Sequence, residues 1–240
     1  MSSTLCIDFG NTRLKAAILV DGNCIEEFFL DAPIDQLSEI LKLHQPTYSI
    51  LSSVIDNMPD VDALLNAHTL FHKLSHTSKL PFTTPAAKPE TIGPDRLALC
   101  AAAVQIFPHQ HNLVIAMGSC ITYNFINSAH EFLGGSISPG MEMRFKSMHQ
   151  FTAKLPEVKP SPLIPLIGYD TGTNLQSGVL FGIAYEIDGF IDAYKKRYSN
   201  FNTIFTGGAA RYLAPHIKNK IFADPFLIYK GRSEERRVGK

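Results

Sequence analysis

The sequence predicts an α/β fold built from two related halves. Of the 240 residues, 45% are hydrophobic and 18% are charged, so the chain can bury a core of ordinary size. Short apolar runs typical of strands alternate with segments whose apolar residues recur at helical spacing. A strand, a glycine turn and a second strand span residues 5–20, and a similar unit restarts at residues 113–126. We therefore expect two domains, residues 1–110 and 111–230, with a boundary near residues 108–112.

The first half is expected to form a strand-rich domain. Asp21 and Gly22 favour a tight hairpin between the second and third strands. Apolar residues at 34, 37, 40 and 41 lie on one face of a helix, and four prolines make residues 81–94 a loop. The expected strands are residues 5–8, 13–20, 25–30, 48–54 and 70–74, and the expected helices are residues 34–43, 61–67 and 95–107.

The second half repeats this alternation and ends in an atypical segment. Four prolines make residues 156–165 a second loop. The expected strands are residues 113–117, 121–126, 132–138 and 203–206, and the expected helices are residues 141–151, 173–198 and 209–214. Apolar periodicity stops at Tyr229, and Lys, Arg and Glu dominate the residues that follow. Residues 231–240 are therefore expected to be an added or altered tail.

Composition and motifs exclude several classes of protein. The formal net charge is zero, which predicts no binding to nucleic acid or to an anionic membrane. No apolar stretch reaches the roughly 20 residues of a membrane span, and because a strand-like segment follows the first residues directly, we expect no signal peptide. Cys6, Cys100 and Cys120 lie among apolar residues and are expected to be buried thiols, which favours the cytoplasm. The glycine motifs of serine hydrolases, Walker A kinases and dinucleotide-binding enzymes are missing.

Residues 8–12, Asp-Phe-Gly-Asn-Thr, follow a buried strand and form a candidate phosphate loop. The glycine lets the backbone turn tightly and brings its N–H groups close to phosphate oxygens. Asn11 and Thr12 add side-chain donors. Asp8 could hold Mg²⁺ through water, because Mg²⁺ gives up its water reluctantly. An ordinary β-turn explains the pentapeptide equally well.

Residues 93–96, Gly-Pro-Asp-Arg, precede the third expected helix. Asp95 could act as the N-cap of this helix, and from the local sequence alone that role is favoured. Alternatively, Asp95 is a general base that takes the proton from a hydroxyl attacking a γ-phosphorus. Arg96 would then pair with a substrate carboxylate.

Three further glycine turns could meet a ligand. Residues 116–123 form a strand, a turn and a strand with hydroxyl side chains, which suits a second phosphate clamp or a plain hairpin. Residues 134–140 end in Pro-Gly, as in a backbone that passes close to a ligand. Gly207 and Gly208 join a strand to a helix, where an adenine ring or a phosphate could fit. Such Gly-Gly turns also occur in α/β folds that bind nothing there.

Taken together, these segments resemble the type III pantothenate kinases, a family in the actin-like ATPase superfamily of acetate and sugar kinases. The resemblance runs from residue 5 to about residue 229. It rests on DFGNT at 8–12, GPDR at 93–96, GSCITY at 118–123, GGSISPG at 134–140, RFKSMHQFTAKLP at 144–156, DTGTNLQSGVLFG at 170–182 and TGGAA at 206–210.

The resemblance implies two ribonuclease-H-like domains, each a mixed sheet flanked by helices, that use ATP and Mg²⁺ to phosphorylate pantothenate in the first step of coenzyme A biosynthesis. It implies a homodimer whose interface completes the pantothenate pocket. Asp95 is the implied catalytic base, and Gly93, Arg96 and Thr171 line the pantothenate site. The implied phosphate and nucleotide site comprises Asp8, Gly10, Asn11, Thr12, Lys15, Gly118, Ser119, Thr122, Gly207 and Gly208.

One departure from the family pattern concerns a cation. The family has an aspartate in the second loop that binds a monovalent cation, K⁺ or NH₄⁺, and Ala116 occupies this position here. Because the alanine removes an oxygen ligand and a negative charge, we expect activity that is weak or independent of the cation. The loss also leaves open a non-catalytic paralogue that binds nucleotide or pantothenate and acts as a regulator. Asp8, Asp95 and Arg96 are intact, which favours the kinase.

Overall fold

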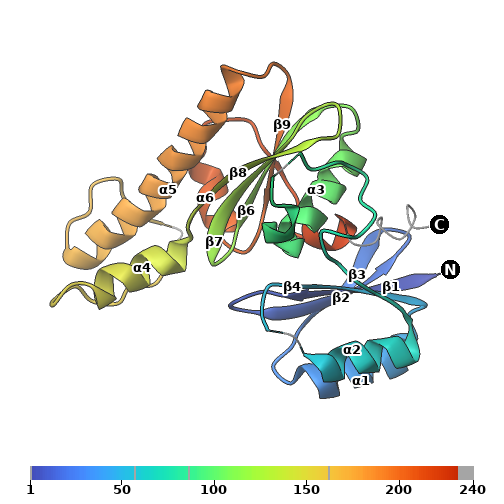
Figure 1. Cartoon of the computed structure of the whole chain (residues 1–240). Coiled ribbons are helices and arrows are strands. Elements are labelled where there is room, and N and C mark those ends of the chain that lie inside the picture. Colours follow the sequence, from blue (N-terminus) through green and yellow to red (C-terminus); the bar gives the residue numbers. More distant parts are fainter. Residues whose placement is uncertain (1, 57, 86, 162, 232–240) are drawn as a thin grey trace. The chain divides into compact units, whose positions relative to one another are not determined.

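The computed structural model describes residues 2–56, 58–85, 87–161 and 163–231. These residues form two compact units (Figure 1). Among these residues, unit 1 contains those up to His109, Ser128–Leu133 and those from Phe226 to Gly231, and unit 2 contains Gln110–Asn127 and Gly134–Pro225. The chain therefore passes between the units more than once. The expected limits, residues 1–110 and 111–230, stay a prediction about which ranges fold independently.

Unit 1 is built on a five-stranded sheet in the order β3-β2-β1-β4-β5. The strands are β1 (Ser3–Phe9), β2 (Leu14–Val20), β3 (Asn23–Phe29), β4 (Tyr48–Ser53) and β5 (Leu70–Lys73). β2 runs antiparallel to β1 and β3, whereas β4 runs parallel to β1 and β5. The predicted hairpin joins β2 to β3, with Asp21 and Gly22 both at positive φ. The result is a mixed sheet with β1 at its centre.

Different elements cover the two faces of this sheet. Helices α1 (Pro33–His44) and α2 (Pro59–His68) pack on the face formed by Leu5, Ile7 and Phe9 (Figure 1). Side chains alternate along a strand, so Cys6 and Asp8 point to the opposite face. Tyr229 packs on Cys6 there, and its carbonyl oxygen accepts a hydrogen bond from the Cys6 thiol at 3.5 Å. The last described residues therefore belong to the core of unit 1.

Helix α3 (Pro94–Ile106) lies in unit 1 and is buried along most of its length. Gly231 packs directly on it, because a Cβ at Gly231 would fall within 3.0 Å of the Ala98 carbonyl oxygen. This glycine was expected to begin the tail, but it is part of the fold. The other residues of the expected tail, 232–240, lie outside the described residues.

Unit 2 is built on a second five-stranded sheet in the order β10-β9-β6-β7-β8. The strands are β6 (His111–Met117), β7 (Cys120–Ile126), β8 (Phe132–Pro139), β9 (Phe201–Thr206) and β10 (Phe222–Ala223). β7 runs antiparallel to β6, and β9 runs parallel to β6 and β10. The helices are α4 (Met141–Gln150), α5 (Thr171–Lys195) and α6 (Ala210–Leu213). α5 packs on the sheet through Ile183 and Ile187, which contact the core around Tyr123.

The strand orders of the two sheets match when β1 is superposed on β6, so the internal repeat expected from the sequence is confirmed. Every expected strand and helix is present, with ends shifted by a few residues. The short strand β10 and the 3-10 turns Pro89–Thr91 and Ala214–His216 were not expected, because two or three residues carry no periodic pattern. No helix among the described residues is long and apolar enough to cross a membrane.

Candidate active site

Asp8 lies near the end of β1, in the middle of a row of polar side chains. The strand register pairs Asp8 with Lys15 of β2 on one side and with Ser52 of β4 on the other. Paired residues on neighbouring strands point to the same face of a sheet. We call these three residues the Asp8 row. The Lys15 ammonium lies 3.5 Å from a carboxylate oxygen of Glu27, on the same face.

The turn that follows β1 has the shape expected of a phosphate loop. The Gly10 N–H group donates to the Arg13 carbonyl oxygen at 3.1 Å and closes the turn. A Cβ at Gly10 would lie 3.3 Å from the same oxygen, so a larger residue would crowd it. Asn11 and Thr12 are exposed at the tip of the turn. Both residues can therefore be reached by a ligand from solvent.

Asp95 lies in the first turn of α3, and it does not cap the helix. The N-cap is Gly93, Pro94 is the first helical residue, and no side chain caps the helix. The capping role favoured from the local sequence was therefore wrong. A Cβ at Gly93 would fall within 3.0 Å of Asp95 Oδ1, so the carboxylate folds back over this glycine. Gly93 thus leaves room for the Asp95 side chain.

Arg96 extends from the same turn toward a short segment of unit 1. Its guanidinium lies over the ring of Phe132, 5.4 Å from the centroid. Phe132 is held in turn by its N–H group, which donates to the Thr83 carbonyl oxygen at 2.8 Å. The cation–π contact restricts the direction of the long side chain, whose guanidinium is a planar fork of five donors that suits a carboxylate.

The first two motifs meet at one edge of the unit 1 sheet. The Val54 N–H group donates to the Phe9 carbonyl oxygen at 3.0 Å, which ties the end of β4 to the end of β1. A Cβ at Gly93 would lie 3.9 Å from Val54 Cγ1, so the start of α3 packs on this same end. The fold therefore brings Asp8 and Asp95 to one edge, although 86 residues separate them in the sequence.

In unit 2, three glycine motifs converge on the turn between β6 and β7. The Gly118 N–H group donates to Cys120, and the Gly140 N–H group donates to Ser119, both at 3.0 Å to the carbonyl oxygen. A Cβ at Gly140 would fall within 3.0 Å of the Gly118 carbonyl oxygen. Gly207 has φ 96, and its Cβ would fall within 3.0 Å of the Met117 carbonyl oxygen. Neighbouring backbone thus explains Gly140 and Gly207 without any ligand.

A second row crosses the unit 2 sheet where the Asp8 row crosses the first. The register pairs Ala116 of β6 with Thr122 of β7 and with Thr206 of β9, and we call these three residues the Ala116 row. Asn124 is fully buried, and its Nδ2 donates to Thr122 Oγ1 at 3.0 Å. The row presents hydroxyl groups on both sides of an alanine and contains no carboxylate.

The remaining candidates in unit 2 lie on separate elements. Thr171 is the exposed first residue of α5, and Gly208 is exposed between β9 and α6. The helix is capped by Asp170, whose side chain accepts the Thr173 N–H group at 2.7 Å. The bonds from Thr173 lower the pKa of Asp170. Cys120 is only half-buried at the start of β7, so the expectation of a buried thiol was wrong for this cysteine.

A polar cluster centred on Glu186 of α5 was not expected from the sequence. Its carboxylate accepts hydrogen bonds from Tyr123 at 2.9 Å and from Ser138 at 2.6 Å, and it pairs with Arg144. Burial acts to raise the pKa of Glu186, but the bonds from Ser138, Arg144 and Tyr123 outweigh it and lower the pKa. Burial and the bond to Glu186 raise the pKa of Tyr123. The cluster ties β7, β8 and α4 to α5.

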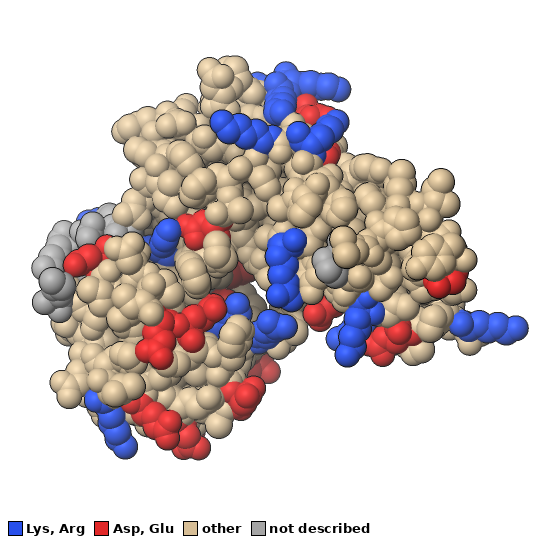
Figure 2. Space-filling model, turned by 180° about the vertical axis from the view of Figure 1, so that it is seen from behind, with Lys and Arg blue, Asp and Glu red and all other residues tan. Residues whose placement is uncertain are grey.

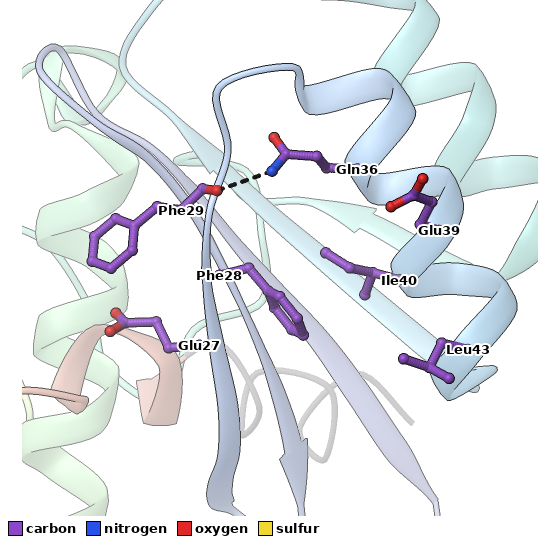
Figure 3. A pocket seen from close by; sticks show the side chains of 7 residues that line it. All are labelled: Glu27, Phe28, Phe29, Gln36, Glu39, Ile40 and Leu43. Carbon is purple, nitrogen blue, oxygen red and sulfur yellow. Dashed lines mark hydrogen bonds between the residues drawn. The ribbon is translucent and has the colours of Figure 1, made fainter.

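Surface charge and one groove can be compared with the loop motifs as candidate binding sites. Lys and Arg side chains are interspersed with Asp and Glu on the face drawn in Figure 2, as the zero net charge predicts. A groove lies between β3 and α1 in unit 1, where the Gln36 amide donates to the Phe29 carbonyl oxygen at 3.3 Å (Figure 3). It is lined by Glu27, Phe28, Phe29, Gln36, Glu39, Ile40 and Leu43. None of these residues belongs to a predicted motif.

Two sheets of one topology, each with a glycine turn after its central strand, define the two-domain ribonuclease-H-like fold of the actin-like ATPases. Solved structures agree. A protein from Campylobacter jejuni described as a putative Baf family transcriptional activator matches with a TM-score of 0.64 and 23% identity, over 98% of each chain. A putative N-acetylmannosamine kinase from Listeria monocytogenes matches with a TM-score of 0.53 and 9% identity, over 99% and 100% of the chains. At these identities the likeness establishes the fold alone.

The chain belongs to the type III pantothenate kinase family, whose model matches residues 4–193. A relative named type III pantothenate kinase from Flavobacterium johnsoniae is 38% identical over 234 residues, which is 96% of each chain. Another of that name, from Bacteroides fragilis, is 41% identical over 231 residues, which is 95% of this chain and 94% of the relative. The resemblance found in the sequence is confirmed.

Proposed function

We propose that this chain transfers the γ-phosphoryl group of ATP to pantothenate, giving 4′-phosphopantothenate and ADP in the first step of coenzyme A biosynthesis. Relatives that are named type III pantothenate kinase match almost the whole chain, and this supports such an enzyme. The observation that carries the proposal is the edge shared by Asp8 and Asp95 in unit 1. Phosphoryl transfer to a hydroxyl needs one carboxylate beside the metal and one that accepts the proton.

The Asp8 edge has the chemistry that Mg²⁺ requires. Mg²⁺ prefers oxygen ligands and usually keeps several waters, and a carboxylate with a hydroxyl beside it suits such a hydrated ion. Asp8 would hold the ion through water, and the bound ion would neutralise charge on the phosphates. The turn at Gly10 to Thr12 would donate N–H and side-chain hydrogen bonds to phosphate oxygens, with the Lys15 ammonium on the same face.

Unit 2 would supply neutral contacts to the nucleotide. In the second loop, Gly118, Ser119 and the Thr122 hydroxyl would bind phosphate oxygens. Asn124 already holds the Thr122 hydroxyl, so the bond costs little side-chain entropy on binding. Gly207 and Gly208 would leave room for adenine or a phosphate beside the turn that follows β9.

The chemical step would be a direct transfer to the primary hydroxyl of pantothenate. Asp95 takes the hydroxyl proton as the oxygen attacks the γ-phosphorus, and the bond from that phosphorus to the β–γ bridging oxygen breaks to release ADP. Arg96, steered by Phe132, pairs with the pantothenate carboxylate. Gly93 keeps the space into which the Asp95 carboxylate folds.

The monovalent cation is the least supported part of the family pattern in this chain. The Ala116 row contains hydroxyls and no carboxylate. A K⁺ or NH₄⁺ ion would therefore lack its charged ligand, and we expect turnover that does not require either ion.

A homodimer accounts for the exposed apolar side chains of unit 2. The segment between α4 and α5 exposes Phe151 by 80%, Leu163 by 88%, Ile167 by 84% and Tyr169 by 80%. Such a concentration favours an interface, because isolated soluble domains seldom expose several large apolar residues together. Thr171 follows this segment directly. A second copy of the chain bound to the segment would therefore lie beside Thr171, which the proposal places against pantothenate. Sedimentation should give twice the mass of one chain.

Cytoplasmic location is consistent with the cysteines. Cys6, Cys24, Cys100 and Cys120 are all free thiols. Free thiols persist in a reducing compartment, which is also where ATP is abundant.

The deciding measurement is conversion of ATP to ADP with Mg²⁺, with and without pantothenate, in K⁺ buffer and in K⁺-free buffer. Pantothenate-dependent turnover in both buffers is expected. The names of the relatives favour the kinase over the regulatory alternative. Folded protein that binds pantothenate but never consumes ATP would reverse that preference.

A further inference from the structure

Ser52 carries a buried hydroxyl that the resting fold does not use. It lies near the end of β4 and is 0% exposed. Its Oγ makes no hydrogen bond with any of the residues that the structure describes. Buried hydroxyls in folded proteins nearly always have a partner, and an unpaired one destabilises the fold relative to alanine. Such a position points to a partner that is engaged only when the site is loaded.

The register identifies that partner. Ser52 pairs with Asp8 in the parallel ladder between β4 and β1, so their side chains point to the same face. Neighbouring strands lie roughly 4.8 Å apart, which puts a serine hydroxyl within hydrogen-bonding reach of the aspartate beside it after a side-chain rotation. Both residues lie at the edge where the end of β4 meets the start of α3.

We propose that Ser52 is a positioning residue for Asp8 when the magnesium nucleotide is bound. The Ser52 hydroxyl donates a hydrogen bond to one carboxylate oxygen of Asp8, and the other oxygen is thereby turned toward the water shell of the ion. The proton stays on Ser52 and no bond is made or broken. A hydrogen bond to a carboxylate is stronger than one between neutral groups, so the loaded state would compensate for the unpaired hydroxyl. The inference rests on the proposed function, because it takes Asp8 as the residue that holds Mg²⁺.

Ser49 provides a matched control on the same strand. It is also 0% exposed, but its Oγ is 2.5 Å from Thr69 Oγ1 and shares a hydrogen bond with it. It lies three positions before Ser52 and therefore points to the other face of the sheet. The two buried serines therefore differ in whether the hydroxyl has a hydrogen-bond partner in the absence of ligand.

The test compares Ser52→Ala and Ser49→Ala in the full chain. Urea unfolding without ligand measures the resting fold, and calorimetry measures ADP affinity with and without Mg²⁺. We expect Ser52→Ala to unfold at the same or a higher urea concentration than the wild type. Its ADP affinity should fall about fivefold to tenfold with Mg²⁺, the size of one charge-assisted hydrogen bond, and should not change without Mg²⁺. Ser49→Ala should show the reverse, with a lower urea midpoint and an unchanged effect of Mg²⁺.

Two results would overturn the proposal. One is a Ser52→Ala protein that unfolds at lower urea and shows the wild-type response to Mg²⁺, since this is what a structural hydroxyl would do. The other is a shift of the acid limb of the pH–rate profile with no change in the response to Mg²⁺, which would assign Ser52 to Asp95. Wild-type protein that binds ADP with Mg²⁺ but does not phosphorylate pantothenate would overturn the proposed function, and the ADP affinities would still decide the role of Ser52.

Discussion

The turns after β1 and β6 occupy the same place in two copies of one sheet topology, and they differ in charge. The Asp8 row is Lys15, Asp8 and Ser52, and the Ala116 row is Thr122, Ala116 and Thr206. Both turns close with a glycine N–H group that donates to a backbone carbonyl. The duplicated backbone therefore preserves the shape of the turn, and under the proposed function the side chain before the turn decides whether a cation is held there. In this chain only unit 1 retains that carboxylate.

The largest expected effect tests whether the chemistry belongs to unit 1. Asp95→Asn should lower kcat by roughly 10²–10⁴-fold, the usual contribution of a general base, with little change in the affinity for ATP. Thr122→Val, in the Ala116 row, should cost only about tenfold, because it removes one hydrogen bond to a phosphate oxygen and leaves the proton acceptor in place. Steady-state kinetics with pantothenate measures both. Equal losses of kcat in the two variants would contradict the proposal that unit 1 carries the chemistry and unit 2 supplies only neutral contacts.

The second expected effect is on stability, and it concerns the residue that follows β4 in unit 1 and β9 in unit 2. Val54 follows β4 in unit 1, but Gly207 follows β9 in unit 2, where the Met117 carbonyl oxygen leaves no room for a Cβ. Gly207→Ala should lower the free energy of unfolding by about 1–3 kcal/mol, because it adds strain at positive φ. Gly208→Ala is the control for stability, since nothing lies within 4 Å of its Cβ position. Urea unfolding that does not separate the two variants would contradict this account.

The third effect would make the halves alike. Ala116→Asp restores a carboxylate at the position equivalent to Asp8. We expect K⁺ to accelerate this variant by about tenfold, which corresponds to an activation free energy lower by roughly 1.4 kcal/mol. Ala116→Asn has nearly the same shape without the charge and should not respond to K⁺. Turnover in K⁺ and in a K⁺-free buffer measures the difference, and no response in the aspartate variant would show that more than one ligand has been lost.

The smallest expected effect concerns the Glu186 cluster, which ties α5 to its neighbours in unit 2. Glu186 has a lowered pKa in the folded protein, so its contribution to stability is present above its ordinary pKa of 4.5 and is lost as the pH falls through the folded value. Glu186→Gln should therefore cost about 1 kcal/mol at pH 7 and progressively less below pH 4.5. Urea unfolding across this range measures it. Glu142→Gln, at an exposed position of α4, is the control and should change the free energy of unfolding by less than about 0.5 kcal/mol.

Periodicity and turn chemistry were sufficient to predict the two halves and the order of their elements, because both are local properties of the chain. The error at Asp95 was avoidable, since proline favours the first position of a helix and so makes the preceding Gly93 the N-cap. The partnership of Ser52 with Asp8 was not predictable, because it depends on the register between β4 and β1. Glu186 had no distinguishing pattern, because Asp188, Asp192 and Lys195 are also charged residues of the same helix. Its partners on β7, β8 and α4 could only come from the structure.

The packing of Tyr229 on Cys6 has a consequence for biosynthesis. The two residues are 223 positions apart, so one face of the first sheet to be synthesised is covered by the last described segment. At roughly 5–20 residues per second, the ribosome needs about 10–45 seconds to supply that cover. During this interval Cys6, Ala17 and Leu19, the apolar patch on that face, lack Tyr229 as their cover. We therefore expect the nascent chain to offer chaperones an apolar patch that Tyr229 covers in the finished protein.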